Sequence, residues 1–484
     1  MGDPSQEVLG QREGGLHRGL SKAQVVMIGL GGAIGTGLFM GSGLAVGYAG
    51  PSVIVSFALA GFVALVMVMS LSEMAVVHPT AGSFGIYAET YLNPWSGFVV
   101  RYTYWISQVI AIGGEAVAAG LYMRYWFPAV PVWTWALGFC LVMLYFNSRS
   151  VGNFGTLEFW LALIKVVAIV LFIILGVTAI LGIGRPAVGF HNLVGLPGGF
   201  LPKGIGGLWM AVTVGIFSFN GIEVIAVTSG ETKNPEVAIP AALRTMGLRL
   251  FLFYVLAITV IVTTIPWTDT GVAVVAQSPF VTVFQYSGIR DAAGIMNFVV
   301  ISAALSSMNT NVYLCARMLF SLSRGGYAPR RLGMLSRRGS PVPAILVSGS
   351  CVLISAAVSA FTPNAYADLF GVALFAAILV WMFILVCHLK FRRRNSVANL
   401  PVRMPLFPWM QYAGLAMLAA ILVTMAFMPT LDLSWVYGVP WVIFISIAYF
   451  VWRARAASSA AQAQVQTAAA APIRQDRTVR RGTE

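Results

Sequence analysis

Three ionisable side chains lie within or directly beside long apolar stretches of this 484-residue sequence. Lys165 lies in FWLALIKVVAIVLFIILG, Glu115 in IGGEAVAAG, and Glu223 directly after FSFNGI. A charged lysine at the centre of an apolar helix costs about 2.5–3.5 kcal/mol to place in a bilayer, so it needs a partner or a function. A buried lysine can load and release a proton near neutral pH, and we interpret Lys165 as a candidate proton-coupling residue.

Each of the three side chains also has a simpler explanation. Lys165 could extend along its helix to the membrane surface, but it lies about nine residues, or about 13 Å, inside its stretch. Glu115 and Glu223 could be hydrogen-bond partners for unwound backbone, or they could hold a substrate, form a gate or carry a proton. The sequence leaves both interpretations of the two carboxylates open.

Glycine is concentrated in GLGGAIGTGLF at residues 29–39, and a second weak point is FSFNGIE at residues 217–223, preceded by Gly215. Glycine weakens a helix by about 1 kcal/mol per residue relative to alanine, so both segments predict a break in a helix. Non-helical backbone at membrane depth survives only where protein or a water-filled cavity covers it. A face for tight helix packing is the alternative, but two such clusters at matched positions favour broken helices.

The elements that must position these residues are transmembrane helices. Of all residues, 58% are apolar and only 10% are charged, and the mean hydropathy is +0.83. Apolar stretches of about 18 or more residues cross the hydrocarbon core as helices, so we predict an all-α polytopic membrane protein with about twelve of them. The predicted spans cover 23–46, 51–72, 97–123, 132–148, 157–182, 206–229, 246–266, 293–322, 342–361, 368–389, 410–429 and 435–452.

The net charge of +14 indicates orientation. With the N-terminus inside, basic residues gather in the connections on that side, above all in 324–338 and 390–403. By the positive-inside rule this predicts a multi-pass protein of the cell (cytoplasmic) membrane with both termini in the cytoplasm. We expect a cytoplasmic segment at 1–22, a transmembrane transporter domain at 23–452 and a disordered cytoplasmic tail at 453–484. The basic charge then suits anionic lipid headgroups, with no nucleic acid partner.

The two predicted breaks lie in the first and the sixth span. Broken helices at equivalent positions of two halves are typical of an inverted-repeat transporter, whose binding site lies at the breaks. An intramembrane enzyme would need a nucleophile with a base or a set of metal ligands, and the sequence has no HExxH, GxSxG or P-loop motif. A channel would show filter loops or rings of charge. A nutrient receptor that binds without transporting stays an alternative.

Four stretches resemble the amino acid–polyamine–organocation (APC) superfamily, and within it the bacterial permeases for aromatic amino acids, GABA and lysine. They are GLGGAIGTGLF at 29–39, SEMAVVHPTAGSFGIYAETYLNPWSGF at 72–98, FSFNGIEVIAVTSGETKNPEVAIPAAL at 217–243 and SSMNTNVYLCARMLFSLSRGGYAP at 306–329. The resemblance implies helices 1–5 and 6–10 as a five-plus-five inverted repeat with broken helices 1 and 6. It also implies two additional helices, 11 and 12, and secondary transport that is usually driven by protons.

The predicted breaks offer partners to both charged groups of an amino acid. A half-helix that starts near Gly35–Gly37 would present free N–H groups and its positive dipole end to a carboxylate. Carbonyl groups of the preceding half-helix, and those near Ser218 and Asn220, would suit an ammonium group. Phe217 and Phe219 could gate the pocket or could be plain core residues. The candidate substrate-binding residues are Ala33, Ile34, Gly35, Thr36, Gly37, Glu115, Phe217, Ser218, Phe219, Asn220 and Gly221.

The resemblance also implies a role for Lys165. In proton-coupled relatives a lysine at the matching position takes the place of a sodium ion between spans one and eight. Here it would contact carbonyl groups around Gly29–Gly32 and the hydroxyl groups of Ser306 and Ser307. The candidate proton-coupling residues are Lys165, Gly31, Ser306, Ser307 and Glu223.

Three further charged residues lie near the ends of spans. We expect Arg101 and Arg317 to extend to the cytoplasmic surface. Glu231, in ETKNPEVAIP, could belong to a helix-breaking loop or to an inner gate. His78 precedes Pro79, and we interpret it as structural.

The predicted function is secondary active transport of an amino acid, as proton symport (uptake) of neutral or aromatic amino acids by alternating access. A cationic amino acid or GABA permease and an amino acid exchanger stay alternatives. The expected partners are an amino acid substrate, the proton as coupling ion and the lipid bilayer, in a monomer or a homodimer. No metal, cofactor or catalytic residue is expected, and the protein is predicted not to be an enzyme.

Overall fold

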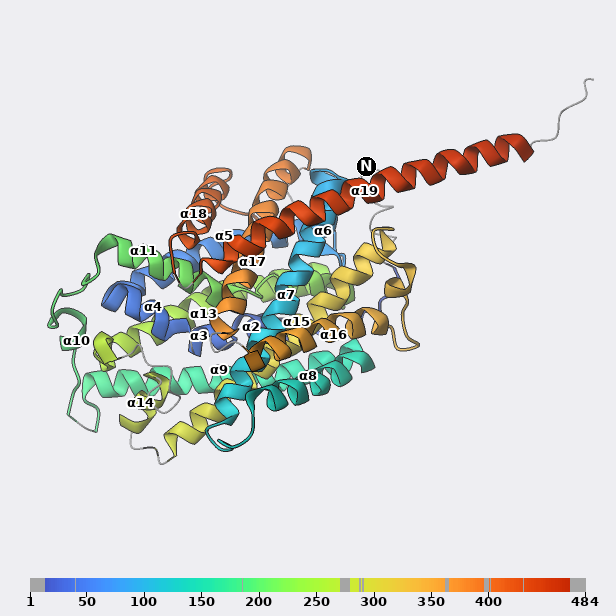
Figure 1. The fold of residues 1–484 in the computed structure, drawn as a ribbon. Coiled ribbons are helices and arrows are strands. Elements are labelled where there is room, and N and C mark those ends of the chain that lie inside the picture. The colour runs from blue at the N-terminus through green and yellow to red at the C-terminus, as the bar shows by residue number, and fades with distance from the viewer. Residues whose placement is uncertain are drawn as a thin grey trace, which may run out of the picture.

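The computed structural model describes residues 14–470, apart from residues 40, 185, 270–278, 287–288, 290, 362–364, 396–399, 401 and 430. In this part of the chain every regular element is a helix (Figure 1). The helices are α2 (Lys22–Ala33), α3 (Thr36–Phe39), α4 (Gly41–Ala49), η1 (Gly50–Ser52), α5 (Val53–Val77), α6 (Ser83–Tyr91), α7 (Pro94–Met123), α8 (Val132–Arg149), α9 (Val151–Leu181), α10 (His191–Val194), α11 (Gly204–Gly215), η2 (Ile216–Phe219), α12 (Val224–Thr228), η3 (Ser229–Glu231), α13 (Pro235–Thr264), η4 (Trp267–Asp269), α14 (Pro279–Tyr286), α15 (Ala292–Arg324), η6 (Arg330–Gly333), α16 (Val342–Phe361), α17 (Ala365–Arg394), α18 (Trp409–Met425) and α19 (Leu433–Ala470).

Long apolar helices confirm the predicted all-α membrane fold. Within the described residues, seven stretches are long and apolar enough to cross a bilayer, and shorter apolar helices accompany them. The seven are Gly41–Val77, Pro94–Met123, Val151–Leu181, Gly204–Glu231, Ala292–Arg324, Leu369–Arg394 and Leu433–Ala456, and the shorter ones are Phe251–Thr264, Val342–Cys351 and Trp409–Met425. Every one of these overlaps a predicted span, while the count of twelve stays a prediction.

The first break separates α2 from α3. Ser21 caps the start of α2 in a capping box with Gln24, which fixes where this helix begins. The helix ends at Ala33, because Ile34 has φ −93° and ψ 84°, outside the helical region. The new helix starts at Thr36. The break at Ile34 and Gly35 therefore lies within the glycine-rich segment that predicts it.

The second break separates α11 and η2 from α12. Asn220 is extended, with φ −64° and ψ 141°, and Gly221 has φ +99°, which an L side chain rarely adopts. A Cβ atom at Gly221 would overlap the carbonyl oxygen of Gly32 in α2. Glycine is thus required twice, for the backbone conformation and for the close approach of the two broken segments.

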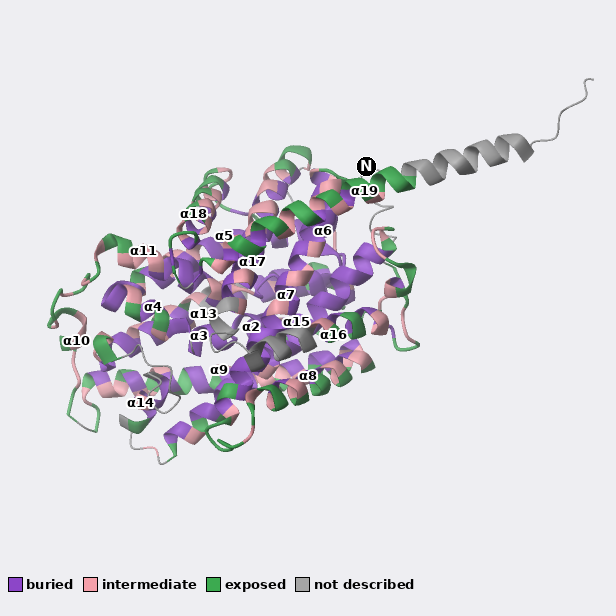
Figure 2. Cartoon of the chain, in the orientation of Figure 1, coloured by how far each residue is buried: buried purple, intermediate pink, exposed green. Residues whose placement is uncertain are grey.

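The broken helices lie at the centre of the molecule. α2 contacts α9, α13 and α15, and α7 crosses the bundle in contact with α15 and α17 (Figure 1). Buried residues fill this centre, whereas α8 and α18 carry many exposed residues (Figure 2). From Trp160 to the end of α9 the exposed side chains are apolar, for example Trp160 at 60% and Ile174 at 52% exposure, as expected for a helix that faces lipid.

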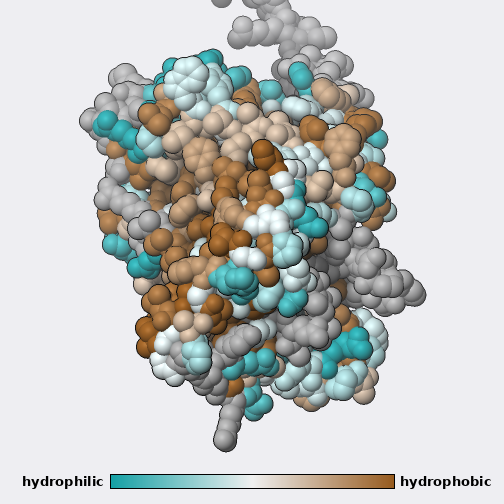
Figure 3. Space-filling model, turned by 90° about the vertical axis from the view of Figure 1, so that its left-hand side faces the viewer, coloured by the Kyte–Doolittle hydropathy of each residue, from teal (hydrophilic) through white to brown (hydrophobic). Residues whose placement is uncertain are grey.

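One end of the bundle is a mixed hydrophobic and hydrophilic surface, and the other carries a long helical extension. At the end that carries α10 and α14, hydrophobic residues cover much of the face, and hydrophilic groups lie among them and along the edges (Figure 3). At the opposite end α19 extends beyond the other helices as far as Ala470 (Figure 1). The first part of the segment 453–484, expected to be disordered, is therefore helical, and residues 471–484 lie outside the described residues, as do residues 1–13 of the predicted N-terminal segment.

Candidate functional site

The buried face of α9 directs Lys165 at the first break. Glu158, Ala162, Lys165 and Ile169 are buried at spacings of three and four residues, so they share one face of the helix. The Lys165 ammonium group donates a hydrogen bond to the carbonyl oxygen of Gly31, and another, of 2.6 Å, to that of Ile34. These carbonyls lie at the C-terminal end of α2, where the helix dipole favours a positive charge. Lys165 thus contacts the segment that the sequence analysis assigned to it.

Glu115 lies on the other side of the same break. Its carboxylate accepts a hydrogen bond from the backbone N–H of Thr36, at 3.3 Å to Oε1 and 3.4 Å to Oε2. The hydroxyl group of Ser307 also bonds to this carboxylate. A Cβ atom at Gly35 would lie 2.6 Å from Glu115 Oε1, so glycine is needed for this approach. The carboxyl group of Glu115 therefore occupies the position at which a substrate carboxylate was expected.

A second buried carboxylate, Glu158, belongs to the site and was missed by the sequence analysis. The hydroxyl group of Ser306 donates to Glu158 Oε1, and Asn309 Nδ2 donates to Oε2 at 2.9 Å. Asn147 Nδ2 in turn donates to Asn309 Oδ1 at 2.8 Å. Ser306 was predicted as a partner of Lys165, and the structure places its hydroxyl group on Glu158 instead. The available signal was an acid seven residues before Lys165, two turns away on the same face of the helix, which the sequence analysis did not single out.

The second break is held by Glu223. Its Oε2 accepts the N–H of Gly221 at 3.1 Å, and its Oε1 accepts the hydroxyl group of Tyr104 at 2.8 Å. Both side chains are fully buried. This geometry fits the structural alternative for Glu223, a carboxylate that stabilises the unwound backbone.

Tyr254 of α13 connects the two breaks, and its role was not predicted. Its hydroxyl oxygen lies 2.5 Å from the carbonyl oxygen of Ala33 and 2.5 Å from that of Ser218, so it donates to one of them at a time. A tyrosine within an apolar stretch carries no sequence signal that separates this role from core packing.

A small cavity of about 20 Å³ lies between the two breaks. This volume holds about one water molecule, so an amino acid enters only when lining groups move apart. The side-chain oxygen Oδ1 of Asn220 has no hydrogen-bond partner among the described residues. The lining residues are Gly32, Ala33, Gly35, Gly37, Ala111, Glu115, Phe217, Ser218, Asn220, Gly221, Ser307 and Asn311.

The two phenylalanines of the second break point in different directions. Phe217 lines the cavity and packs on Phe370, with ring centroids 4.0 Å apart. The ring of Phe219 instead packs on Tyr254 at 4.5 Å, away from the cavity. The cause is η2, because a 3₁₀ helix has about three residues per turn and separates the directions of residues two apart. Of the two candidates, only Phe217 is placed to contact a substrate.

Comparison with known proteins identifies the family of this chain. A family model described as amino acid permease matches residues 24–461. The chain belongs to the amino acid permease family. It is 39% identical over 442 residues to an uncharacterized amino acid permease, YtnA, of Bacillus subtilis, covering 90% of this chain and 95% of the relative.

Two relatives of this permease have names that state a substrate. The γ-aminobutyric acid permease of Bacillus subtilis is 38% identical over 466 residues, covering 95% of this chain and 98% of the relative. The aromatic amino acid transport protein AroP of Escherichia coli strain K12 is 38% identical over 446 residues, with 91% and 96% covered. Membership of this family confirms a transport protein of the APC superfamily and not an enzyme, and the fold agrees with a helical transporter of this type.

A buried ion pair of the permease connects α15 to η3, which follows the second break. Arg317 binds Glu231 in a bidentate manner, with Nε–Oε2 and Nη2–Oε1 distances of 2.9 Å. The Tyr313 hydroxyl group donates to the same carboxylate at 2.5 Å, and the Arg317 guanidinium lies 3.9 Å above the Tyr313 ring. The N–H of Leu20 donates to the Glu231 carbonyl oxygen at 3.1 Å, which attaches the N-terminal segment to this pair.

The expectation that Arg317 and Arg101 extend to the surface was wrong. Arg317 is 1% exposed and Arg101 is 0% exposed. Arg101 pairs with Glu89 and donates to Ser321 Oγ at 2.9 Å. Each arginine finds an acid from another helix within the bundle, so it has no need of the water at the surface.

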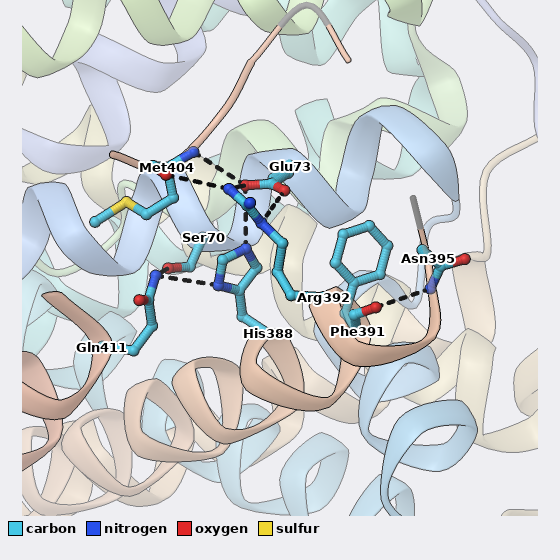
Figure 4. Close-up of polar contacts among 8 residues, drawn as sticks. All are labelled: Ser70, Glu73, His388, Phe391, Arg392, Asn395, Met404 and Gln411. Atoms are coloured by element: carbon cyan, nitrogen blue, oxygen red, sulfur yellow. Dashed lines mark hydrogen bonds and ion pairs between the residues drawn. The ribbon is translucent and has the colours of Figure 1, made fainter. Parts of the chain in front are cut away.

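A second buried network at this end of the permease was also missed (Figure 4). Glu73 of α5 pairs with Arg392 and with His388 of α17, at 2.5 Å and 3.1 Å, and accepts the N–H of Met404 at 3.1 Å. Gln411 of α18 donates to Ser70 Oγ at 3.3 Å and lies 3.2 Å from His388 Nδ1. The network joins three helices, and its longest contact, between Ser70 and Gln411, spans 341 positions of the chain. No local pattern in the sequence reveals such a contact.

Proposed function

We propose that this permease is a secondary active transporter that takes up a neutral or aromatic amino acid together with a proton, by alternating access. The observation that carries the proposal is the pair of opposite charges at the first break. Lys165 binds the carbonyl end of α2 and Glu115 binds the N–H end of α3. A site built from broken-helix ends of this kind suits a zwitterion.

The substrate would exchange its charged groups for those of the protein. Its carboxylate competes with Glu115 for the N–H of Thr36, and its ammonium group is attracted to the Oδ1 of Asn220, which has no partner among the described residues, and to the carbonyls beside it. Each new hydrogen bond to the substrate replaces a hydrogen bond within the protein or to water. The net gain in binding free energy is therefore about 1 kcal/mol per contact. Binding energy is then available for closing the lining groups over the substrate.

The wall beside the cavity favours an apolar or aromatic side chain. It is formed by Ile110, Ala111, Gly114, Phe217, Leu369, Phe370 and Ala373 around Thr36 and Glu115. Aromatic rings here gain from packing on Phe217 and Phe370. The relationship to AroP agrees with such a substrate. The relationship to the γ-aminobutyric acid permease keeps a GABA-type or cationic substrate as the second candidate, because Glu115 lies in the same wall.

Lys165 supplies a mechanism for proton coupling. The protonated ammonium group holds both carbonyls at the end of α2. Loss of the proton removes a charge and a donor, so the contact between α9 and the first break weakens. A change in the protonation of Lys165 is thereby linked to movement of the broken helix. An amino acid exchanger would use the same cavity but would not need a change in the protonation of Lys165.

We place the permease in the cytoplasmic membrane with both termini in the cytoplasm. The N-terminal segment lies against the basic loop before α16, because a Cβ atom at Gly339, next to Arg337 and Arg338, would lie 2.5 Å from His17. Positive residues are retained on the cytoplasmic side during insertion, which supports this orientation.

The test is transport by the purified protein in proteoliposomes, screened over the twenty amino acids and GABA. We expect counterflow of labelled phenylalanine, tyrosine or a neutral aliphatic amino acid, and accumulation only with an inward proton gradient. Binding without counterflow would indicate a receptor and overturn the transport proposal. Counterflow that no proton gradient converts into accumulation would indicate an exchanger and overturn the symport.

A further inference from the structure

A basic pocket lies far from the broken helices, where α8 ends and the loop before α16 begins. Its volume is about 410 Å³, and its lining residues are Tyr145, Ser148, Arg149, Ser336, Arg337, Arg338 and Val342. We call it the arginine pocket. α8 and α16 lie side by side here (Figure 1), so the pocket is formed by segments that are almost 200 residues apart in sequence.

The three arginines of the pocket are exposed and have no acidic partner among the described residues. Elsewhere in the same part of the chain Arg101, Arg317 and Arg392 are each paired with a glutamate. Positive charges that converge without a counter-charge attract an anion. The forked guanidinium group suits the paired oxygens of a phosphate.

Local contacts hold the Arg149 side chain and the backbone of the loop in place. Arg149 Nη2 donates to the hydroxyl oxygen of Tyr145 at 2.6 Å, and its guanidinium carbon lies 4.6 Å above the Tyr145 ring. The loop turns tightly, because Ser336 Oγ accepts the N–H groups of Arg338 at 3.4 Å and Ser340 at 3.2 Å. The backbone of Ser336 also donates to the carbonyl oxygen of Ser340 at 2.9 Å. Arg337 and Arg338 are therefore presented from an ordered turn.

The arginine pocket opens onto an apolar surface. On α8, Leu141 is 56% exposed and Val142 46%, and on α16, Leu346 is 57% exposed and Val347 39%. These side chains face the lipid in a bilayer-spanning protein. Tyr145, 54% exposed, stands between them and the arginines, at the level where amphipathic rings meet headgroups. A ligand that fits both the arginine pocket and this surface is therefore charged at one end and apolar at the other.

We propose that the arginine pocket binds the phosphodiester headgroup of an anionic phospholipid, whose acyl chains lie along the apolar surface of α8 and α16. The continuity of the pocket with that surface favours a lipid over a soluble phosphate. Binding of one lipid bridges α8 and the loop before α16 without taking part in substrate recognition. The proposal stands on these contacts alone and does not depend on proton coupling or on the identity of the amino acid.

The test measures lipids retained by the purified permease by native mass spectrometry, with phosphatidylglycerol and phosphatidylcholine supplied at equal concentration. The variant is R149Q/R337Q/R338Q. The control, R330Q/R331Q/R393Q, removes the same charge from exposed arginines outside the pocket. We expect wild type and control to retain phosphatidylglycerol in preference to phosphatidylcholine. The pocket variant should lose most of that preference, at least about tenfold in apparent affinity for loss of several charged hydrogen bonds.

Two further arms separate the alternatives. The lysine variant R149K/R337K/R338K keeps the charge and should keep part of the preference, which shows that the pocket variant fails through its ligand and not through its fold. Equal retention of phosphatidylglycerol by the pocket variant and the control would overturn the proposal. So would displacement of the lipid by millimolar glycerol phosphate, because the pocket would then take a soluble phosphate.

Discussion

Lys165 and Glu115 bind opposite ends of the same break in the first transmembrane segment. The ammonium group of Lys165 donates to the carbonyl oxygens of Gly31 and Ile34, and the carboxylate of Glu115 accepts the N–H of Thr36. Each charge has the sign that the adjoining helix end favours. The two side chains therefore stabilise a backbone conformation that would otherwise leave polar groups unpaired at membrane depth.

Replacement of Lys165 by alanine should abolish accumulation driven by a proton gradient. The variant loses two hydrogen bonds from a charged donor, each worth about 1.5–3 kcal/mol, and the sum corresponds to a drop of at least about a hundredfold in the coupled rate. Uptake into proteoliposomes with and without a pH gradient measures this. Lys390→Ala, which removes an exposed lysine at the end of α17, should behave as wild type. Full gradient-dependent uptake by Lys165→Ala would exclude it as the coupling residue.

The sequence predicted the parts of this site that are exceptional for a membrane helix. A lysine inside an apolar stretch and clusters of glycine stand out by residue type alone, and both breaks lie within the predicted segments. Glu158 and Tyr254 did not stand out, since one lies near the start of a span and the other is an ordinary residue of an apolar helix. Their roles arise from contacts across 148 and 221 positions, which depend on the packed fold.

The same limit explains the arginines that were misplaced. Arg101 and Arg317 lie near helix ends, and from the sequence a long cationic side chain there is expected to reach water. What decides their position is an acid on another helix, Glu89 for Arg101 and Glu231 for Arg317. A single sequence contains no signal for such a pair.

Gly221→Ala should disrupt both stability and transport. Alanine at φ +99° is strained by about 1–2 kcal/mol, and its Cβ atom would also overlap the carbonyl oxygen of Gly32. We expect a lower melting temperature in detergent and loss of most uptake. The matched control is Gly47→Ala in α4, where a Cβ atom meets no neighbour within 4 Å. That change should leave transport intact and stabilise the helix slightly, and a variant pair with equal melting temperatures would contradict the account of Gly221.

Glu231→Gln should destabilise the permease by leaving Arg317 buried with a neutral partner. Breaking a buried ion pair from one side typically costs about 3–5 kcal/mol. The double variant Glu231→Gln/Arg317→Gln removes both charges and should recover part of that loss. Thermal unfolding of the two single variants and the double variant in detergent gives the coupling between the residues. Additive losses would mean that the 2.9 Å contacts contribute no coupling.

The same end of the molecule holds a histidine whose charge should control stability at mildly acidic pH. The ring nitrogen Nε2 of His78 lies 2.7 Å from the hydroxyl oxygen of Tyr91, which also accepts Asn395 Nδ2 at 3.2 Å. Burial raises the pKa of Tyr91 to about 12, so its hydroxyl group keeps its proton over the whole range from pH 5 to 7.5. A neutral His78 ring can share this hydrogen bond as donor or as acceptor, depending on its tautomer.

Stability of the permease should therefore fall as the pH drops below about 6.5, the usual pKa of histidine. Burial lowers the pKa of His78, so the unfolded chain binds a proton in a pH range in which the folded protein does not. The contribution of His78 to the free energy of unfolding is fully present above about pH 6.5. It is lost as the pH falls toward the pKa of His78 in the folded protein, which is lower. Melting temperatures of wild type and His78→Gln between pH 7.5 and 5 measure it. Glutamine cannot titrate, so this variant should show a smaller decline, whereas parallel curves for the two proteins would mean that other groups cause the acid sensitivity.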